Sequence, residues 1–333
     1  MRAILIEKPG DETVMRLGEA PPPPLLPGSV RIRVAATAVN RADLLQRQGL
    51  YPPPPGASEI LGLECAGLVA EVAPGVPGLA AGDRVMALLS GGGYAEEVVA
   101  HAGSLLPVPA RLSLEEAAAV PEVFLTAFLN LFQLGALPEG GAALVHGGGS
   151  GVGTAAIQLL KVSGSRCLVT AGSDEKCRRC RELGADAAVN YRSGDFVAAA
   201  RELTGGRGVD VVLDHVGAPY LERNLQALAV GGRLLVIGVL GGARSELNLA
   251  ALLTRRLQVI GSTLRARPPA EKAALVAAFR ERFGAALEAG EIRPIVDRVL
   301  PLERAPEAHR VLQESAHFGK VVLSVGVPDA RPL

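Results

Sequence analysis

A cluster of glycines between an apolar run and a helical pattern is the part of this sequence best suited to chemistry. The stretch Ala143 to Lys161 reads ALVHGGGSGVGTAAIQLLK, in which Gly151, Gly153 and Ala156 have the GxGxxG/A spacing. In such a turn the first amides of a helix, with the positive end of its dipole, can hold a pyrophosphate because no side chain blocks the approach. The spacing is weak alone and much stronger inside a strand-turn-helix unit. We therefore predict a dinucleotide site here, with a ligand-free glycine connection as the alternative.

The residues that follow the next expected strand bear on which dinucleotide binds. The strand over Arg166 to Thr170 does not end in the Asp or Glu that usually holds the ribose hydroxyls of NAD. Ser173 can donate to a 2'-phosphate and Lys176 can neutralise it, which favours NADPH. Ser173 is equally explained as a helix N-cap and Lys176 as an exposed helix residue. Asp174 and Glu175 suit a helix start but bring negative charge close to the proposed phosphate.

Helices and strands alternate on both sides of the glycine turn. A helix over about Glu122 to Leu134 precedes the turn, and further helices begin near Ser173, Asp195, Tyr220 and Leu247. After the first strand, which ends at His146, strands are expected at Arg166 to Thr170, Ala187 to Tyr191, Val209 to Asp214, Arg233 to Val239 and Leu257 to Ser262. Six strands with helical crossovers predict an α/β protein with a parallel, doubly wound sheet.

The two ends of the chain have a different pattern. Ser29 to Val39 alternates apolar and polar residues, and further short apolar runs follow, so residues 1 to about 120 look β-rich. After residue 265 a helix over Pro269 to Ala289 and a closing strand over Lys320 to Val325 are expected. We predict that this tail rejoins the first part of the chain. Residues 1–120 and 265–333 then form one domain, and residues 121–264 form an inserted nucleotide-binding domain.

Composition limits the classes of function. Of the 333 residues, 49% are hydrophobic and 20% are charged, as in an ordinary globular protein. Lys plus Arg and Asp plus Glu both number 34, which argues against broad electrostatic capture of nucleic acid or anionic membrane. We expect no apolar run long enough to span a membrane and no signal peptide, and we place the protein in the cytoplasm. Cys177 and Cys180 are interpreted as incidental thiols on a helix, because nothing nearby completes a zinc site.

With these motifs in place, the chain resembles the zinc-independent quinone oxidoreductases of the medium-chain dehydrogenase/reductase superfamily, the group that includes zeta-crystallin. It is most similar to the p53-inducible quinone oxidoreductase branch. The matching segments include AVNRADLLQRQGLYPPPPGASEILGLECAG, MALLSGGGYAEEV, PEVFLTAF, HGGGSGVGTAAIQLLK, VTAGSDEK, LGADAAVNY and GKVVL. They span nearly the whole chain. The family glycine pattern usually has Gly where this chain has Ser150, a small change that keeps Gly151 and Gly153.

The resemblance implies a GroES-like β domain built from both ends of the chain, a Rossmann domain between them, and a homodimer. Residues matching those that contact the adenosine and phosphates of NADPH are Gly151, Val152, Ser173, Lys176 and Tyr191. Residues matching those near the nicotinamide half are Thr126, Val239, Leu264 and Arg265. Together with Gly153 of the glycine turn, these are the predicted cofactor-binding residues.

The same comparison predicts that no metal is bound. Zinc alcohol dehydrogenases of this superfamily place a Cys and a His where this chain has Asn40 and Leu63, and the PEVFLTAF segment supplies no Cys. Catalytic zinc normally needs three protein ligands. Without a Lewis acid to help deprotonate an alcohol, an easily reduced acceptor is the favoured substrate.

Two polar residues are candidates for catalysis. A quinone, or an alkene conjugated to a carbonyl, accepts hydride directly while charge accumulates on oxygen, so a hydrogen-bond donor to that oxygen is needed. Asn40 and Tyr51 are expected to line the pocket, and Tyr51 can also stack on a flat ring. Alternatively, Asn40 caps the following turn and Tyr51 packs on the proline tract 52–55.

The predicted function is therefore an NADPH-dependent quinone reductase that transfers hydride, or single electrons, without metal or flavin. The acceptor is a small quinone or other activated carbonyl compound, and no nucleic acid or membrane partner is expected. The nearest alternative is an NADPH-dependent enoyl or alkenal reductase, which uses the same fold with another acceptor. The second alternative is a non-catalytic NADPH-binding sensor or structural protein.

Overall fold

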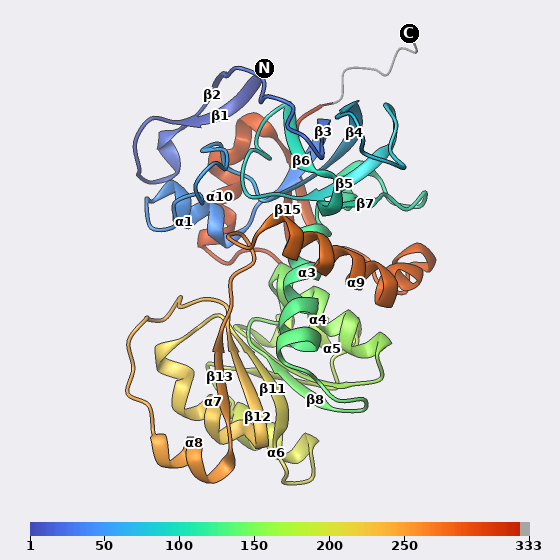
Figure 1. Ribbon diagram of the computed structural model, residues 1–333. Coiled ribbons are helices and arrows are strands. Elements are labelled where there is room, and N and C mark those ends of the chain that lie inside the picture. The colour runs from blue at the N-terminus through green and yellow to red at the C-terminus, as the bar shows by residue number, and fades with distance from the viewer. Residues whose placement is uncertain (327–333) are drawn as a thin grey trace. The chain divides into compact units, whose positions relative to one another are not determined.

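The structure is a computed structural model that describes residues 1–326, and the chain forms two compact units (Figure 1). The first comprises Met1–Leu125, Leu264–Glu288 and the segment from Pro294 onward. The second comprises Thr126–Thr263 and Ala289–Arg293. The sequence-based division had assigned residues 121–264 to the inserted domain. In the structure, the start of the helix at Pro121 belongs to the first unit, and residues 289–293 join the second.

A parallel six-stranded sheet forms the centre of the second unit, which confirms the predicted doubly wound α/β fold. Its strands are β8 (Ala142–Val145), β9 (Arg166–Ala171), β10 (Ala187–Asn190), β11 (Val209–Asp214), β12 (Leu228–Val236) and β13 (Gln258–Gly261). They lie in the order β10-β9-β8-β11-β12-β13, and every neighbouring pair is parallel. The strand order reverses at β8, so a ligand crevice is expected at the carboxyl ends of β8 and β11.

The α-helices that follow its strands are α4 (Gly151–Val162), α5 (Asp174–Leu183), α6 (Phe196–Leu203), α7 (Leu221–Ala227) and α8 (Leu249–Arg255). Because crossovers between parallel strands are right-handed, α4 and α5 cover one face, and α6 and α7 cover the other (Figure 1). On the second face Leu144, Leu168 and Val212 of the strands pack with Phe196 of α6 and Leu225 of α7. This buried apolar layer fixes the strand ends that carry the predicted binding residues.

The fifth strand differs from its prediction. It was expected at Arg233 to Val239, but β12 begins at Leu228 and ends at Val236. Beyond it the chain turns across the end of β11, where Leu240 N donates to His215 O at 3.1 Å and Gly241 N donates to Val216 O at 2.8 Å. The apolar residues between Arg233 and Val239 predicted a continuous strand and gave no sign of this turn. Val239 therefore lies in an exposed loop and not in the sheet.

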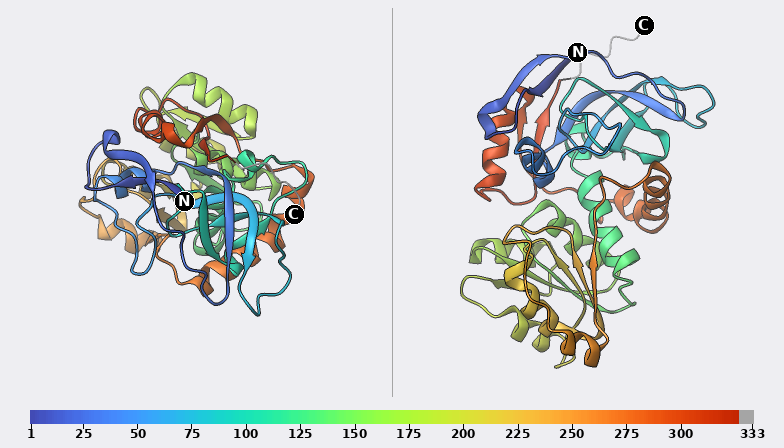
Figure 2. Two further views of the ribbon diagram at one scale, coloured as in Figure 1. Left: turned by 90° about the horizontal axis from the view of Figure 1, so that it is seen from above. Right: turned by 60° about the vertical axis from the view of Figure 1, so that its left-hand side comes forward.

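Both ends of the described chain contribute to the sheets of the first unit. Its strands are β1 (Arg2–Ile6), β2 (Met15–Glu19), β3 (Ser29–Ala38), β4 (Glu64–Val72), β5 (Arg84–Leu88), β6 (Glu97–His101), β7 (Leu105–Pro107), β14 (Val296–Pro301) and β15 (Lys320–Ser324). The larger sheet has the order β14-β15-β3-β4-β5-β7, with β6 also paired to β3. Because β15 is antiparallel to β3, the late strand completes a sheet that early residues begin (Figure 2).

The main helices of the first unit are α1 (Arg41–Arg47), α2 (Leu114–Ala117), α9 (Pro269–Ala289) and α10 (Ala305–Gln313). A capping box is present at the start of α2. Glu116 N donates to Ser113 Oγ at 3.1 Å, and Ser113 N donates to Glu116 Oε2 at 2.9 Å. Two N-terminal amides of the helix are thereby satisfied.

One apolar helical run corrects an expectation drawn from the sequence. Leu114–Leu134 comprises α2, α3 (Pro121–Phe128) and a π-helix (Leu129–Leu134), and it is long and apolar enough to cross a membrane. We had expected no run of that length. However, 83% of its most apolar window is buried inside the protein, which is typical of a core helix.

Candidate functional site

In the glycine turn between β8 and α4, other atoms approach two of the glycines so closely that no side chain fits there. A Cβ on Gly153 would lie 2.3 Å from Gly147 O, and the nearest atoms belong to backbone that cannot yield. Gly147 has a φ of +68°, and a Cβ there would lie 2.2 Å from Cε1 of His215. The turn can therefore form only where these positions carry no side chain.

The start of α4 presents hydrogen-bond donors at this turn. Ser150 caps the helix, since its Oγ accepts from Gly153 N at 3.0 Å and its carbonyl accepts from Thr154 N at 2.8 Å. The amides of Gly151 and Val152 have no hydrogen-bond partner within residues 1–326. Two open donors at the positive end of a helix dipole fit a pyrophosphate. Ser150, at the position where glycine is usual, keeps this arrangement intact.

Three of the predicted cofactor residues gather at the end of β9. A Cβ on Gly172 would lie 2.8 Å from the hydroxyl oxygen of Tyr191, so the tyrosine side chain at the end of β10 lies against this glycine. Ser173 caps α5, with its Oγ accepting from Lys176 N at 3.2 Å. The Tyr191 ring is exposed and available for stacking. Ser173 and Tyr191 thus lie beside the end of β9, and Lys176 lies in the first turn of the helix that follows it.

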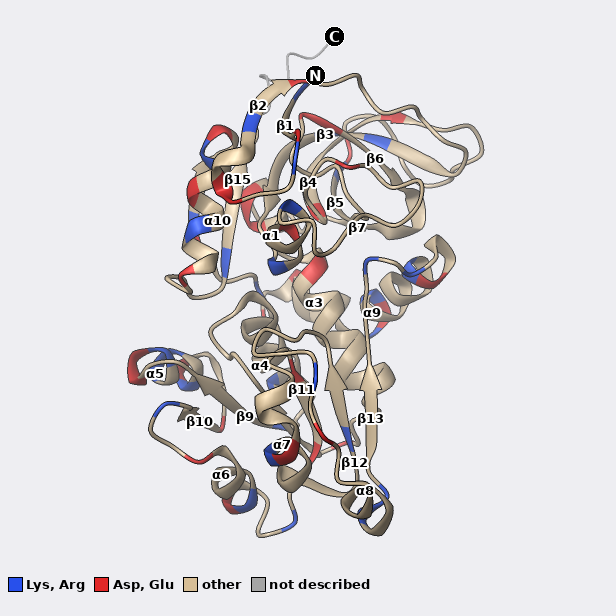
Figure 3. Cartoon of the chain, turned by 90° about the vertical axis from the view of Figure 1, so that its left-hand side faces the viewer, with Lys and Arg blue, Asp and Glu red and all other residues tan. Residues whose placement is uncertain are grey.

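The acidic residues beside this strand end have partners. Asp174 Oδ1 accepts from Asn190 Nδ2 at 2.9 Å. Glu175 forms an ion pair with Arg178 at 2.6 Å, which lowers the pKa of that glutamate. Figure 3 shows charges of both signs along α5. Pairing reduces the opposition that these carboxylates offer to a bound phosphate.

Buried polar residues hold the ends of β8 and β11 in place. His146 Nε2 donates to Asn224 Oδ1 at 2.7 Å, and its Nδ1 accepts from Thr170 Oγ1 at 2.9 Å. Burial lowers the pKa of His146 to about 3, so its ring is neutral. Asn224 Nδ2 also donates to Asp214 Oδ2 at 3.1 Å. These groups satisfy one another, and His146 is a core histidine rather than a base.

Arg265 supports the loop that carries Tyr51, and both residues belong to the first unit. The arginine is only 3% exposed, and its guanidinium group lies over the tyrosine ring, 5.4 Å from the centroid. It donates to three neutral acceptors: Ser90 O at 2.9 Å, Tyr51 O at 3.2 Å and Gln46 Oε1 at 2.7 Å. The predicted contact of Arg265 with the nicotinamide stays a prediction. The observed bonds give it a positioning role toward Tyr51.

The hydroxyl group of Tyr51 makes no hydrogen bond to the described part of the chain. It has no hydrogen-bond partner among residues 1–326, although the residue is partly buried. Burial also raises the pKa of this phenol, which keeps it protonated. Tyr51 can therefore donate to an oxygen atom of a bound molecule, as predicted for a catalytic residue.

In the side chain of Asn40, by contrast, both the amide nitrogen and the amide oxygen are hydrogen-bonded. Its Nδ2 donates to Glu64 Oε1 at 2.9 Å, and its Oδ1 accepts from Lys320 Nζ at 2.7 Å. Glu64 and Lys320 form a buried ion pair with a distance of 2.8 Å. Asn40 is 8% exposed. The amide braces this pair, and the catalytic role predicted for it stays a prediction.

Three further predicted residues are divided between the two units. Thr126, in α3, accepts through its carbonyl oxygen from Asn130 Nδ2 at 2.8 Å, and Val239 lies in the exposed loop after β12. Both belong to the second unit, whereas Leu264 is a buried residue of the first unit beside Arg265. Among residues 1–326, no group of three or more His, Cys, Asp or Glu side chains is placed to hold a metal ion.

Two polar residues near Arg265 escaped the sequence analysis. Lys272 of α9 is buried and donates from Nζ to Ser90 Oγ at 2.5 Å and to Arg265 O at 2.7 Å. Glu122, the first acidic residue of α3, donates from its backbone N to Glu64 Oε2 at 2.8 Å. Lysine and glutamate are ordinary in helices, so neither position differs from a surface residue in local sequence. Only the packing of distant segments reveals them.

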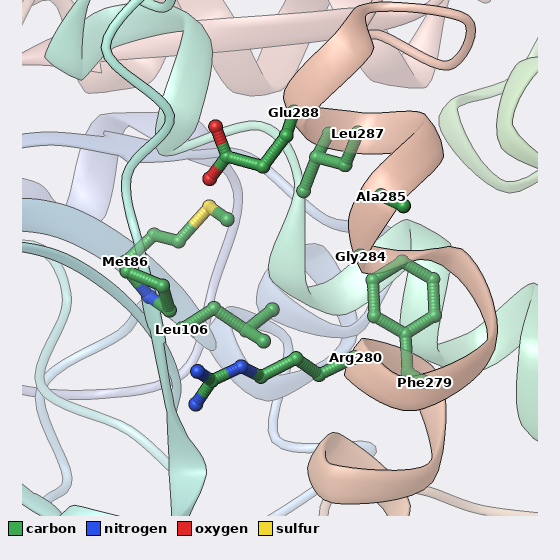
Figure 4. Close-up of a pocket in the computed structure, with 9 residues that line it drawn as sticks. Met86, Leu106, Phe279, Arg280, Gly284, Ala285, Leu287 and Glu288 are labelled. Carbon is green, nitrogen blue, oxygen red and sulfur yellow. The ribbon is translucent and has the colours of Figure 1, made fainter.

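A pocket of about 240 Å³ lies elsewhere in the first unit, beside α9 (Figure 4). Met86 and Leu106 face Phe279 and Leu287 across it. It contains none of the predicted site residues, and its lining is mostly apolar. We do not assign the chemistry to this pocket.

Two family models match the chain. The model "Alcohol dehydrogenase GroES-like domain" matches residues 26–110, and the model "Zinc-binding dehydrogenase" matches residues 151–281. The chain is 30% identical over 329 residues to a quinone oxidoreductase of Rattus norvegicus, and the match covers 97% of each protein. It is 33% identical over 299 residues to a phenolphthiocerol/phthiocerol polyketide synthase of Mycobacterium tuberculosis. That match covers 89% of this chain but only 13% of the much longer synthase.

Solved structures give the same result. The Escherichia coli quinone oxidoreductase complexed with NADPH has a TM-score of 0.85 and 30% identity, with coverage of 97% of this chain and 100% of that chain. A NAD-dependent alcohol dehydrogenase has a TM-score of 0.85 and 39% identity, with coverage of 98% and 100%. The architecture and both units are therefore shared with these proteins.

Proposed function

Because this chain belongs to the medium-chain dehydrogenase/reductase superfamily and is an NAD(P)-dependent oxidoreductase, we propose that it uses NADPH to reduce a quinone. One observation carries the proposal. Asn40 and Leu63 stand where zinc alcohol dehydrogenases of the superfamily have ligands, and Asn40 is committed to the Glu64–Lys320 ion pair. The free hydroxyl of Tyr51 suits an acceptor that needs a hydrogen bond and no metal.

In the proposed reaction, some residues bind the cofactor and others bind the acceptor. The amides of Gly151 and Val152 hold the pyrophosphate, and Tyr191 packs on the adenosine. When bound, the reduced nicotinamide supplies the hydride. The hydroxyl of Tyr51 donates to the acceptor oxygen, where negative charge develops, while Arg265 fixes the loop from which it acts.

Lys176 decides between the two dinucleotides in this proposal. Replacing Lys176 with Glu is expected to weaken NADPH binding by about 1.5 to 3 kcal/mol, because a cation that pairs with the 2'-phosphate becomes an anion that repels it. NADH binding should hardly change. Fluorescence titration of each cofactor measures the two dissociation constants. The charge-matched control is Lys161→Glu. Lys161 is exposed and lies in the last turn of α4, at the end away from the glycine turn. Equal losses for NADPH and NADH in the Lys176 variant would contradict the assignment.

The acceptor is tested by NADPH oxidation with metal-stripped protein. We expect turnover with a quinone such as 9,10-phenanthrenequinone to exceed turnover with a 2-alkenal and with an enoyl thioester. Dependence of quinone turnover on added zinc would contradict the proposal. Tight NADPH binding without oxidation by any acceptor would instead favour a non-catalytic sensor or structural role.

A second candidate function is an NADPH-dependent enoyl or alkenal reductase. It is favoured by the similarity of nearly the whole chain to a segment of a much longer polyketide synthase. Conjugate reduction also builds negative charge on a carbonyl oxygen, which Tyr51 would meet in the same way. Turnover mainly of the alkenal or the thioester in the experiment above would establish this alternative.

We also propose that the protein forms a homodimer through β13. This strand is an edge of the six-stranded sheet, and Leu249 and Leu253 of the preceding α8 are 69% and 79% exposed. An edge strand beside exposed leucines is an association surface unless something covers it. Sedimentation velocity should give twice the chain mass, and a monomer at all micromolar concentrations would contradict the proposal.

A further inference from the structure

Lys272 lies on the buried face of helix α9, where its neighbours are apolar. Besides Lys272, the buried residues of this helix are Leu275, Val276, Phe279, Phe283, Ala286 and Leu287. They recur at intervals of three and four residues, which is the pattern of a helix face packed against the protein interior. The Phe279 ring packs against the Phe124 ring of α3, with the centroids 6.3 Å apart. Lys272 therefore projects from a helix that packing holds in place.

The ammonium group of Lys272 joins two segments that are distant in the sequence and belong to the first unit. The lysine is 4% exposed, and its Nζ donates to Ser90 Oγ at 2.5 Å and to Arg265 O at 2.7 Å. The Ser90 hydroxyl donates to Arg265 O at 3.3 Å, and Arg265 Nε donates to Ser90 O at 2.9 Å. These bonds form a closed set, so Lys272 and Ser90 together fix the backbone of Arg265.

Arg265 connects this cluster with the loop that carries Tyr51. Its guanidinium group donates to Tyr51 O at 3.2 Å and lies over the Tyr51 ring. It also donates to Gln46 Oε1 at 2.7 Å, and Gln46 Nε2 donates to Glu59 O at 2.8 Å. Both ends of the loop 51–59 are thus bound to Arg265, one directly and the other through Gln46. The position of the Tyr51 ring therefore depends on Arg265.

Lys272 and Arg265 bring two buried positive charges to this cluster. Every acceptor that they bind within residues 1–326 is an uncharged carbonyl, amide or hydroxyl oxygen. Burying a cation without a carboxylate partner costs free energy of folding, so the cluster is a poor device for stability alone. A cation over the Tyr51 ring does, however, attract negative charge that develops near the hydroxyl. Burial raises the pKa of Tyr51, and the charge of Arg265 opposes that rise.

We propose that Lys272 is a positioning residue for the reduction, an inference that rests on the proposed function. It holds Arg265 in the place from which Arg265 directs the Tyr51 hydroxyl at the acceptor oxygen. In this role Lys272 contacts neither the acceptor nor the cofactor and transfers no proton. The effect is large because misplacement of a catalytic group by about 1 Å costs about 100-fold in rate.

The first test is the variant Lys272→Met, which keeps the length of the side chain and removes its ammonium group. With the best acceptor we expect kcat to fall about 10- to 100-fold, while KM for NADPH changes little, because Lys272 is not among the residues proposed to hold the dinucleotide. In a Tyr51→Phe protein, which lacks the hydroxyl to be positioned, the same replacement should lower kcat by less than about 3-fold. A general structural loss would lower kcat by the same factor in both proteins.

Two further variants accompany this test. Arg280→Met removes an exposed cation from the same helix, about two turns after Lys272, and should behave as the wild type. Ser90→Ala removes the hydroxyl between Lys272 and Arg265 O but keeps the backbone oxygen that binds Arg265 Nε. It should lower kcat in the same sense, but less than Lys272→Met does. If Lys272→Met does not fold, Ser90→Ala with and without Tyr51→Phe decides the question.

A second readout needs neither cofactor nor acceptor. It is the NMR spectrum of protein whose tyrosine rings are labelled with carbon-13. The chain has four tyrosines, and the Tyr51 signal is the one that is absent from Tyr51→Phe. In Lys272→Met this signal should shift, because the guanidinium group above the ring is no longer fixed. The signals of the other three tyrosines should stay in place.

The outcomes separate the two proposals. If the wild type reduces an acceptor and Lys272→Met lowers kcat equally with and without the Tyr51 hydroxyl, or not at all, the role of Lys272 is overturned while the reductase proposal stands. A Tyr51 signal that does not move in Lys272→Met also overturns it, because the lysine then does not position the ring. A wild type that turns over no acceptor overturns both proposals.

Discussion

The variant Gly153→Ala is expected to lower the affinity for NADPH by about 100-fold, or roughly 2.7 kcal/mol. The added Cβ would lie 2.3 Å from Gly147 O and 2.7 Å from two backbone atoms of Gly148. Real side-chain carbons do not approach that closely, so the turn must move away from the start of α4. Movement of the turn displaces the open amides of Gly151 and Val152 from the pyrophosphate. Calorimetric titration with NADPH measures the loss.

A matched glycine in the same unit provides the control. A Cβ on Gly261, at the end of β13, meets no atom within 4 Å, and Gly261 is not among the glycines with positive φ. Gly261→Ala should therefore bind NADPH as the wild type does. The cradle assignment would be wrong if both variants bound the cofactor equally well, or if Gly153→Ala lost NADPH affinity no more than Gly261→Ala.

Lys320→Met is expected to reduce the free energy of unfolding by about 3 to 5 kcal/mol. The lysine is buried, pairs with the fully buried Glu64 at 2.8 Å, and donates to Asn40 Oδ1 and to Val39 O. Its removal leaves a carboxylate in the interior without its counter-charge. Because Lys320 lies in β15 and Glu64 in β4, the lost contact also loosens the C-terminal strand from the sheet. Urea unfolding followed by circular dichroism measures the change.

A double variant separates the charge from the packing. In Glu64→Gln with Lys320→Met the uncompensated charge is absent, so the double variant should be more stable than Lys320→Met alone. Arg2→Met removes a cation from an exposed pair with Glu96, and it should leave stability nearly unchanged. A Lys320→Met protein that is as stable as Arg2→Met would show that the buried pair does not hold the strand.

Much of the nucleotide unit could be predicted because its evidence is local. A strand, a glycine turn and a helix are contiguous in the sequence, so the spacing of Gly151 and Gly153 and the N-cap position of Ser173 were readable directly. The six parallel strands are confirmed. Where prediction failed, as at the end of β12, the contacts came from residues beyond another strand: Leu240 N donates to His215 O, which follows β11.

In the first unit, by contrast, the contacts that matter join residues far apart in the sequence. Arg265 was assigned from the resemblance to the cofactor, but its guanidinium group binds residues 46, 51 and 90, far away in the sequence. The apolar run Leu114–Leu134 is buried for a similar reason, since other segments of the chain cover it. No pattern within these segments distinguishes a supporting arginine or a buried helix from ordinary segments of the same composition.

By itself, then, the sequence determined the class of fold and predicted the phosphate cradle, because both depend on neighbours along the chain. The positions where zinc ligands are replaced came from the resemblance to a known family. Only the tertiary structure decided that Asn40 braces a buried ion pair, that Arg265 holds Tyr51, and that Lys272 is buried beside Ser90 and Arg265. These properties depend on which charged side chains, distant in the sequence, are buried close together in the folded protein. Burial and Coulomb interactions act through space, and sequence distance does not encode them.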